Sequence, residues 1–218
     1  MEMQRKTAEE LKAMYDEVDG FFEDLARARL GEKWFHILPD GSPAYMWWWD
    51  DVGLFEEGLA RARKGDKWFH ILPDGGSAYE ERYDDVCPFF KGLARVRLNG
   101  EWFHITPDGK PAYEQRYDWI GPFSEGLAVA SKGDKWFHIH PDGSNAYEQR
   151  YDWVDDFHCE RARARVGDKW FHIRPDGSDA YEQMYPEVGP FIDGKARVHQ
   201  YNTMFYIYPD GSRVDPDN

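Results

Sequence analysis

A 34-residue repeat runs through almost the whole chain and limits its fold more than any other feature. Trp34, Trp68, Trp102, Trp136 and Trp170 lie 34 residues apart, and Met204 takes the sixth position. A Pro-Asp-Gly turn recurs with the same spacing and no insertion interrupts it, so repeats one to six are residues 15–48, 49–82, 83–116, 117–150, 151–184 and 185–218. A fixed period of this length is typical of arrays in which each repeat packs on its neighbours.

Each repeat contains the pattern of a β-hairpin. In the second repeat, residues 59–63 and 68–72 alternate between two classes of side chain, with Gly65-Asp66 between them. Alternation with a period of two is the signature of strands. The third repeat has Asn99-Gly100 at the same loop, which is a strong hairpin signal. Counting outward from a two-residue loop places Arg63 opposite Trp68, Ala62 opposite Phe69, Arg61 opposite His70 and Ala60 opposite Ile71.

Two further elements are expected. The turn Pro73-Asp74-Gly75 should reverse the chain into a third strand over residues 78–83. Near the start, Thr7-Ala8-Glu9-Glu10 fits a capping box, and Leu11, Met14, Tyr15 and Val18 follow at helical spacing. We therefore expect one short helix, at about residues 8–16, that covers the first repeat.

These elements predict an all-β tandem repeat: six 34-residue, three-stranded antiparallel units in an open superhelical β-solenoid. Residues 1–14 form its N-terminal helical cap and residues 15–218 form the six-repeat β domain. An open stack needs terminal repeats that differ from the others, and both ends differ here. The alternative is a closed six-bladed, propeller-like ring, although blades of four strands usually need about 40–45 residues.

The charge balance restricts the partners. With 41 acidic and 27 basic residues the net charge is −14, so we expect neither nucleic acid nor an anionic membrane as a partner. No run approaches the roughly 18–20 apolar residues that span a bilayer, and the N-terminal residues lack the apolar stretch of a secretion signal. Cys87 and Cys159 occupy different positions in their repeats and form no disulfide framework. These features predict a cytoplasmic protein.

The repeated strings resemble the bacterial WG (KWG) repeat family. Phe55 to Tyr83 contains the pattern Phe-x-Glu-Gly-Leu-Ala-Arg, then Gly-Asp-Lys-Trp, Ile-x-Pro-Asp-Gly and Tyr-Asp. The resemblance implies a β-structured array with an interaction role, and it supplies no catalytic residue. One difference is systematic, because the family's glycine after the tryptophan is replaced here at Phe35, Phe69, Phe103, Phe137 and Phe171. A weaker similarity, confined to one hairpin, links Lys67–Gly75 to the choline-binding repeats of cell-wall proteins.

Motifs for catalysis, cofactors or metals were sought and not found. The chain contains none of the phosphate-loop, dinucleotide, nucleophile-elbow or zinc-protease patterns. The repeated histidines are His36, His70, His104, His138 and His172. We interpret them as packing residues beside arginine and tryptophan. His138-Ile139-His140 occurs once and lacks an evident third ligand. We therefore expect a non-enzymatic chain with no cofactor and no metal.

Two groups of residues are candidates for binding. The first is the hairpin face that carries arginine, tryptophan and histidine: Arg61, Arg63, Trp68, His70, Arg95, Arg97, Trp102 and His104. The second is Trp47-Trp48-Trp49, where other repeats carry charged residues before a tyrosine, together with Trp119 and Trp153. The N-terminal helix would cover the tryptophan cluster, or the cluster is an exposed platform for a protein or a sugar.

The sequence thus predicts a non-catalytic repeat scaffold for protein–protein interaction. The alternative is a module that binds carbohydrate or the cell envelope. A protein partner is expected, while its identity and the oligomeric state stay open.

Overall fold

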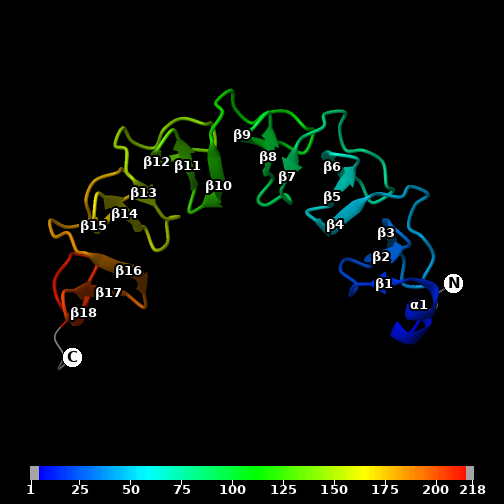
Figure 1. The fold of residues 1–218 in the computed structure, drawn as a ribbon, viewed down its shortest axis with the longest axis horizontal. Helices are drawn as coiled ribbons and strands as arrows, with labels where there is room; N and C mark the ends of the chain where they lie inside the picture. The colour runs from blue at the N-terminus through cyan, green and yellow to red at the C-terminus, as the bar shows by residue number, and fades with distance from the viewer. Residues whose placement is uncertain (1–4, 215–218) are drawn as a thin grey trace. The chain divides into compact units, whose positions relative to one another are not determined.

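The computed structural model describes residues 5–214. Its internal contacts divide the chain into two halves, Met1–Ala112 and Tyr113–Asn218, and each is described by itself. Both halves consist of small three-stranded antiparallel sheets that follow one another along the chain (Figure 1). Among the described residues, no helix has the length and apolar character required to cross a membrane.

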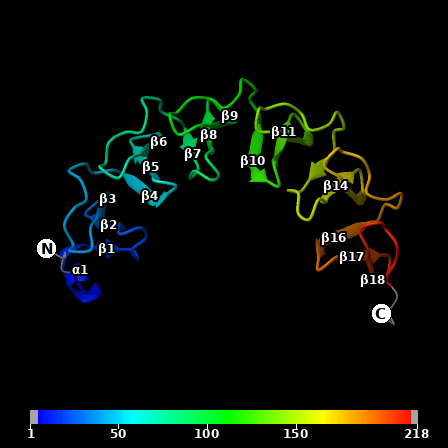
Figure 2. The same ribbon diagram turned by 180° about the vertical axis from the view of Figure 1, so that it is seen from behind.

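The N-terminal half begins with a helix and contains the sheets of repeats one to three. Seen from either side, α1 lies beside β1 (Figures 1 and 2). The elements are α1 (Ala8–Met14), β1 (Glu17–Val18), β2 (Ala26–Leu30), β3 (Lys33–Ile37), β4 (Asp51–Glu56), β5 (Leu59–Lys64), β6 (Lys67–Ile71), β7 (Asp85–Val86), β8 (Ala94–Leu98) and β9 (Glu101–Ile105).

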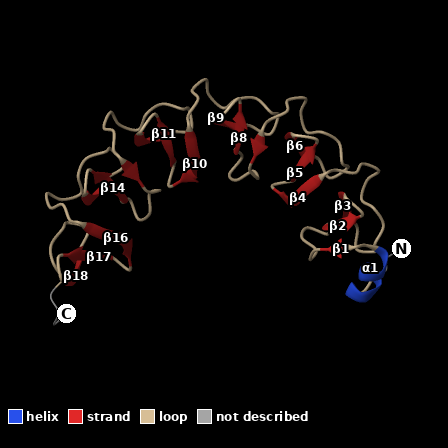
Figure 3. Ribbon diagram, in the orientation of Figure 1, coloured by secondary structure: helices blue, strands red, loops and turns tan. Residues whose placement is uncertain are grey.

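The C-terminal half contains the sheets of repeats four to six, and its described part consists of strands and loops (Figure 3). The strands are β10 (Trp119–Ser124), β11 (Leu127–Lys132), β12 (Lys135–Ile139), β13 (Trp153–Val154), β14 (Ala162–Val166), β15 (Lys169–Ile173), β16 (Glu187–Ile192), β17 (Lys195–Gln200) and β18 (Thr203–Ile207). Three-stranded antiparallel units in six copies are therefore confirmed.

The third strand of each sheet is not the one that the sequence predicted. In the second repeat it is β4, which precedes the hairpin β5–β6, so the sheet order is β4-β5-β6. Residues 78–83, the predicted strand, form bends that end in an isolated bridge between Tyr83 and Trp68. Nη1 of Arg82 donates to the carbonyls of Tyr79, Glu80 and Glu81 at 2.8–3.0 Å and so stabilises the bends in this repeat. Repeats one and five bend in the same way with Trp48 and Met184 at this position.

The predicted hairpin register is confirmed. Ala60 pairs with Ile71, Arg61 with His70, Ala62 with Phe69 and Arg63 with Trp68. On one face, the small Ala60 and Ala62 lie opposite the large Phe69 and Ile71, and all four are buried. Burying a side chain of the size of isoleucine or phenylalanine contributes about 1.5–3 kcal/mol, so this face is the core of each sheet.

Odd and even repeats differ in their first strand. In repeats two, four and six this strand has six residues and contains a bulge, between Val52 and Phe55 in repeat two. In repeats one, three and five it has two residues. The even repeats carry glycine just after the second strand residue. At Gly53, a Cβ would lie 2.7 Å from Cγ of Arg61, so the glycine gives this side chain room in repeat two, whereas at Gly189 the nearest atom would lie 3.6 Å away. Structurally, the period is therefore two repeats.

Neighbouring repeats pack through the glycine of the Pro-Asp-Gly turn. Gly75 adopts φ +79°, and a Cβ there would lie 2.5 Å from Cγ of Tyr45 in the preceding repeat. Gly177 and Tyr147 repeat this contact in the C-terminal half. The tyrosine ring lies directly on the turn backbone, so the glycine is required both for its backbone conformation and for the close approach.

Helix α1 is shorter than expected but has the predicted cap. Thr7 and Glu10 form the capping box, and Leu11 is buried. Gly41, the turn glycine of repeat one, is contacted by Leu11 and Lys6, where later turns are contacted by a tyrosine. The helix thus covers the turn of the first repeat as a preceding repeat would.

Candidate binding grooves between repeats

The repeated histidines connect each hairpin to the following repeat. Tyr181 Oη lies 2.6 Å from Nδ1 of His172, and Nε2 lies 3.0 Å from the carbonyl oxygen of Gly189 in repeat six. A carbonyl can only accept, so Nε2 carries the proton and Nδ1 accepts from the tyrosine hydroxyl. Phe191 packs on the imidazole with ring centroids 4.4 Å apart.

This arrangement removes the histidines from the predicted recognition surface. His70 and His104 are no more than 1% exposed. Nε2 of His70 lies 3.0 Å from the carbonyl oxygen of Cys87, and Phe89 packs on its ring, so the beginning of the next repeat covers it. Burial lowers the pKa of His36, His70, His138 and His172 to about 4. The histidines are therefore neutral core residues near neutral pH.

The arginines and tryptophans of the same face remain half-buried. The guanidinium carbons of Arg61 and Arg63 lie 5.2 and 5.7 Å from the Trp68 ring, and Arg97 lies 5.5 Å from Trp102. These distances are typical of cation–π contacts. Arg95 is half-buried beside them. The arginine and tryptophan side chains of this face therefore contact one another, and these contacts bury part of their surface.

Repeat four departs from this row. Val129 and Ser131 stand where repeats one, two, three and five have arginines, and Trp119 packs against Trp136 with ring centroids 5.3 Å apart. In repeat five, Trp153 packs on Trp170 at the same centroid distance. Trp119 and Trp153, predicted as binding residues together with the tryptophan cluster, are therefore each paired with a tryptophan of the same repeat.

The Trp47–Trp49 cluster does not form a strand, and its members differ in exposure. Trp47 is 59% exposed and Trp48 is 47% exposed, whereas Trp49 is 8% exposed and meets Phe69 edge-on. Trp48 stacks on Phe35, where other repeats place an arginine on the equivalent phenylalanine. The N-terminal helix packs at Gly41 and leaves Trp47 and Trp48 accessible.

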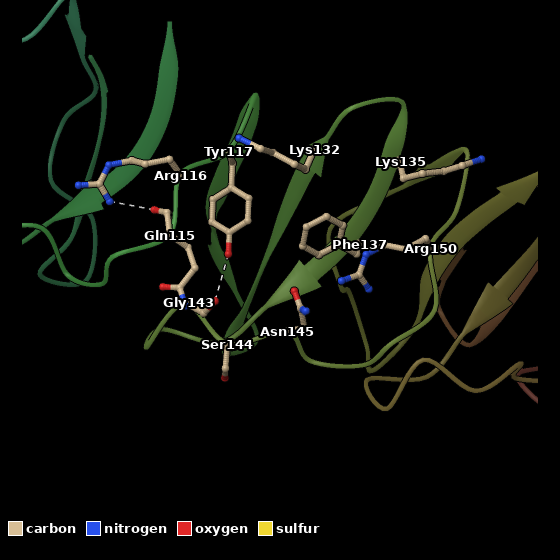
Figure 4. Close-up of a pocket in the computed structure, with 10 residues that line it drawn as sticks. All are labelled: Gln115, Arg116, Tyr117, Lys132, Lys135, Phe137, Gly143, Ser144, Asn145 and Arg150. Atoms are coloured by element: carbon tan, nitrogen blue, oxygen red, sulfur yellow. Dashed lines mark hydrogen bonds between the residues drawn. The ribbon is translucent and has the colours of Figure 1, made fainter. Parts of the chain in front are cut away.

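One groove in each half lies at equivalent positions of the repeat pattern. The groove of the N-terminal half, between repeats one and two, has a volume of about 430 Å³ and is lined by Trp47, Trp49, Lys64, Lys67, Phe69, Gly75, Gly76, Ser77 and Arg82. The groove of the C-terminal half, between repeats three and four, has about 640 Å³ and is lined by Gln115, Arg116, Tyr117, Lys132, Lys135, Phe137, Gly143, Ser144, Asn145 and Arg150 (Figure 4). Both volumes suit a ligand or a peptide side chain.

The floor of each groove is a phenylalanine covered by an arginine. The guanidinium carbon of Arg150 lies 4.0 Å from the centre of the Phe137 ring, and Arg82 lies at the same distance from Phe69. Nη1 of Arg150 also donates to the carbonyls of Tyr147, Glu148 and Gln149 at 2.9–3.1 Å. The arginines are therefore held in place before any ligand arrives.

Two lysines that flank the hairpin turn form the rim of each groove. Lys64 pairs with Lys67, and Lys132 pairs with Lys135. Lys67 bonds Asp84 at 2.6 Å and Lys135 bonds Asp152 at 2.7 Å. These carboxylates raise the pKa of Lys67 and Lys135 above the usual value, so both stay charged at any physiological pH.

The aspartates of these pairs have a structural role. Asp152 accepts from Lys135 and from the backbone N–H of Gly167, and both bonds lower its pKa. Asp84 makes the equivalent bonds to Lys67 and to the N–H of Asn99. Each aspartate therefore ties one hairpin turn to the turn of the next repeat.

The first histidine of the His-x-His motif is part of the core. Both ring nitrogens of His138 are engaged, by Tyr147 and by the carbonyl of Asp155. Within residues 5–214, no three His, Cys, Asp or Glu side chains are grouped so that they could hold a metal ion.

The grooves were not predicted from the sequence, because they lie on the opposite face of the hairpin from Trp68. Side chains alternate along a strand, so Lys67 and Phe69 point away from the face of Trp68 and His70. A signal was nevertheless present: Lys-Gly-Asp-Lys occurs at the hairpin turn of repeats two and four, and the other repeats lack one or both lysines. Of the predicted residues, Trp47 and Trp49 line a groove.

Fold and grooves together define an all-β tandem-repeat protein with surfaces built between its repeats. Residues 10–34, 49–68, 81–102, 105–136 and 139–170 match the model of the WG containing repeat, which covers more than half of the chain. The chain belongs to this family. The phenylalanine that replaces the family's glycine is the residue on which the grooves are built.

Other comparisons are distant. No curated protein matches the chain in sequence. Among solved structures it is similar to Kluyveromyces lactis Hsv2, with 9% identity and a TM-score of 0.44 over 88% of this chain and 77% of that chain. It is also similar to YCF48 bound to D1 peptide, with 14% identity and a TM-score of 0.39 over 92% and 80%. A protein of unknown function from Bacteroides caccae has 11% identity and a TM-score of 0.34 over 84% and 89%.

Proposed function

We propose that this chain is a non-catalytic scaffold that binds a protein partner through the grooves between its repeats. One observation carries the proposal: each half of the chain has a groove at the same place in the repeat, formed by two neighbouring repeats, with an aromatic floor and a basic rim. Arginine and aromatic residues are the side chains that most often dominate protein interfaces.

The non-catalytic part of the proposal is supported by what the repeated polar groups already do. The histidines bond a tyrosine and a carbonyl, and the aspartates hold hairpin turns. These are the titratable groups that an active site would have drawn on, and each has a structural task repeated along the chain.

Three finer features belong to the same proposal. An open solenoid, rather than a closed ring, is supported by α1, which takes at Gly41 the place of a preceding repeat. A cytoplasmic location is supported by the free thiols Cys87 and Cys159. The net charge of −14 supports a protein partner over nucleic acid or an anionic membrane.

The test is capture of partners on the immobilised full chain. We expect one protein to be retained by the wild type and by Lys12→Gln/Lys91→Gln, which removes two charges outside the grooves. Trp47→Ala/Trp48→Ala and Lys132→Gln/Lys135→Gln should each retain less of it. Equal retention by all variants, or no retained protein at all, would contradict the proposal.

A carbohydrate or cell-envelope module is the second candidate, and the exposure of Trp47 and Trp48 favours it. Flat indole faces suit sugar rings as well as protein side chains. A glycan array separates the two functions: retention of a glycan that Trp47→Ala/Trp48→Ala abolishes, without a captured protein, would replace the first proposal by the second.

A further inference from the structure

We infer that both grooves bind acidic, extended peptide segments, one segment in each groove, with Lys64 and Lys67 or Lys132 and Lys135 as the carboxylate-binding residues. This inference rests on the proposed function and specifies the chemistry of the partner.

The first argument is the sign of the charge. The groove between repeats three and four is lined by four cationic side chains, Arg116, Lys132, Lys135 and Arg150, and by no carboxylate. The groove between repeats one and two is lined by Lys64, Lys67 and Arg82, again without a carboxylate. These grooves are concave basic sites on a chain with a net charge of −14, so they attract an acidic segment that the rest of the surface repels.

The second argument is which of these cations can reach a ligand. Arg150 lies over the Phe137 ring, and the Nη1 atoms of Arg150 and Arg116 are both engaged by backbone carbonyls. The lysines stand at the rim, and the side chains of Lys132 and Lys135 are 51% and 43% exposed. Lys132 forms an ion pair with Asp118, and Lys135 forms one with Asp152. Because both ammonium groups stay partly exposed beside these aspartates, an incoming carboxylate can reach the lysine pair while its neighbours contact the arginine that covers the floor.

The third argument is the placement of the lysines along the chain. Position by position, Lys132 is replaced by Leu30, Leu98, Val166 and Gln200 in repeats one, three, five and six, and by Lys64 in repeat two. The lysine pair therefore occurs in the even repeats two and four, which also have the longer first strand. Only those repeats are expected to bind a carboxylate in this way, which gives two sites per chain.

The two grooves should prefer different peptide residues next to the acidic one. Trp47 and Trp49 stand where Gln115 and Tyr117 stand in the other groove. Trp47 offers an exposed ring next to the lysine pair, whereas Gln115 offers an amide. We expect the groove of repeats one and two to favour an aromatic residue next to the acidic one, because contact between two aromatic rings stabilises more than burial of the same apolar area alone.

The experiment is an NMR titration of the full chain, in which each groove serves as the control for the other. The probe is a peptide of about ten residues that alternates Glu and Ser, long enough in extended form to cross a groove, with both termini blocked. Two comparison peptides replace Glu by Gln or by Lys. The Glu peptide should shift the amide signals of Gly75–Ser77 and Gly143–Asn145, and added salt should weaken both effects.

Lys132→Gln/Lys135→Gln should weaken binding at Gly143–Asn145 about tenfold, as expected for two partly exposed charge contacts, and leave Gly75–Ser77 unchanged. Lys64→Gln/Lys67→Gln should have the opposite pattern, and Lys12→Gln/Lys91→Gln should change neither. Equal binding of the Gln or Lys peptide, or a loss of binding that does not follow the mutated groove, overturns the inference.

The outcome is separable from that of the proposed function. If a captured partner depends on the groove residues while the Glu peptide binds no better than its Gln counterpart, the scaffold function stands and the acidic specificity is wrong. If the Glu peptide binds as described and no protein is captured, the acidic specificity of the grooves stands and the scaffold function is wrong.

Discussion

Tyr181 donates its hydroxyl hydrogen to Nδ1 of His172 across 2.6 Å, inside a core that excludes water from both groups. Nε2 of His172 in turn donates to the carbonyl oxygen of Gly189, which belongs to the next repeat. The same tyrosine–histidine–carbonyl chain starts at Tyr45 and at Tyr147. These chains are polar links between repeats whose main contacts are apolar.

Removing the tyrosine hydroxyl should destabilise the fold measurably. Tyr181→Phe leaves Nδ1 of His172 buried without a donor, which costs about 1–3 kcal/mol. Urea unfolding should show this decrease in the free energy of unfolding. Tyr201→Phe is the matched control, because Tyr201 is 91% exposed and should lose almost nothing. Equal effects of the two substitutions would show that the bond is not important.

The buried histidines predict loss of stability in mild acid. Their pKa in the folded chain is about 4, below the unfolded value of about 6.5, so the unfolded chain binds more protons between these pH values. The stabilisation is complete above pH ~6.5 and is lost progressively as pH falls towards 4. At pH 5 each histidine should lower the free energy of unfolding by about 2 kcal/mol. Urea unfolding at pH 7 and pH 5 checks this, and equal stabilities would contradict it.

The turn glycines should be far less replaceable than other glycines with the same backbone. Gly75 and Gly58 have φ +79° and +77°, but a Cβ meets Tyr45 at the first and nothing within 4 Å at the second. Gly58→Ala should cost about 1–2 kcal/mol from backbone strain alone. Gly75→Ala should cost about 1–3 kcal/mol more, because the tyrosine must move. Thermal unfolding measures the destabilisation of both variants. Similar losses of stability would contradict the proposed packing of the tyrosine on the turn.

Glu57 should stabilise the repeat that follows it. Its carboxylate accepts hydrogen bonds from the backbone N–H groups of Lys91 and Gly92, at 2.7 and 2.8 Å. Glu57→Gln exchanges one acceptor oxygen for a donor, and we expect it to cost about 1 kcal/mol. Hydrogen exchange should become faster at Lys91 and Gly92. Glu56→Gln changes a neighbouring exposed glutamate and should leave that exchange unaltered, and acceleration by both variants would contradict the bond's importance.

Much of the single repeat could be predicted from sequence, because local rules determine it. The six three-stranded units, the capping box and the pairing of Arg63 with Trp68 are confirmed. The strand expected at residues 78–83 was wrong, since alternation alone does not reveal that β4, which precedes the hairpin, takes the third place in the sheet and that the chain bends after the Pro-Asp-Gly turn.

The site was harder to predict because it forms between repeats. His70 was assigned to an exposed face, and nothing within its own repeat shows that the strand of the next one covers it. The grooves arise from Phe69 and Phe137 together with residues of the preceding repeat. The alternation of the lysine pair was visible in the sequence, but its meaning required the position of the phenylalanine floor.

Site-specific photo-crosslinking tests most directly whether partners bind in the grooves between repeats. A photoreactive phenylalanine analogue at Gln115 lies in a groove, and one at Arg165 lies on the arginine–tryptophan face, where Arg165 contacts Trp170. The captured partner should crosslink at position 115 and not at position 165. Crosslinking at position 165 alone would place recognition on the other face and contradict the account.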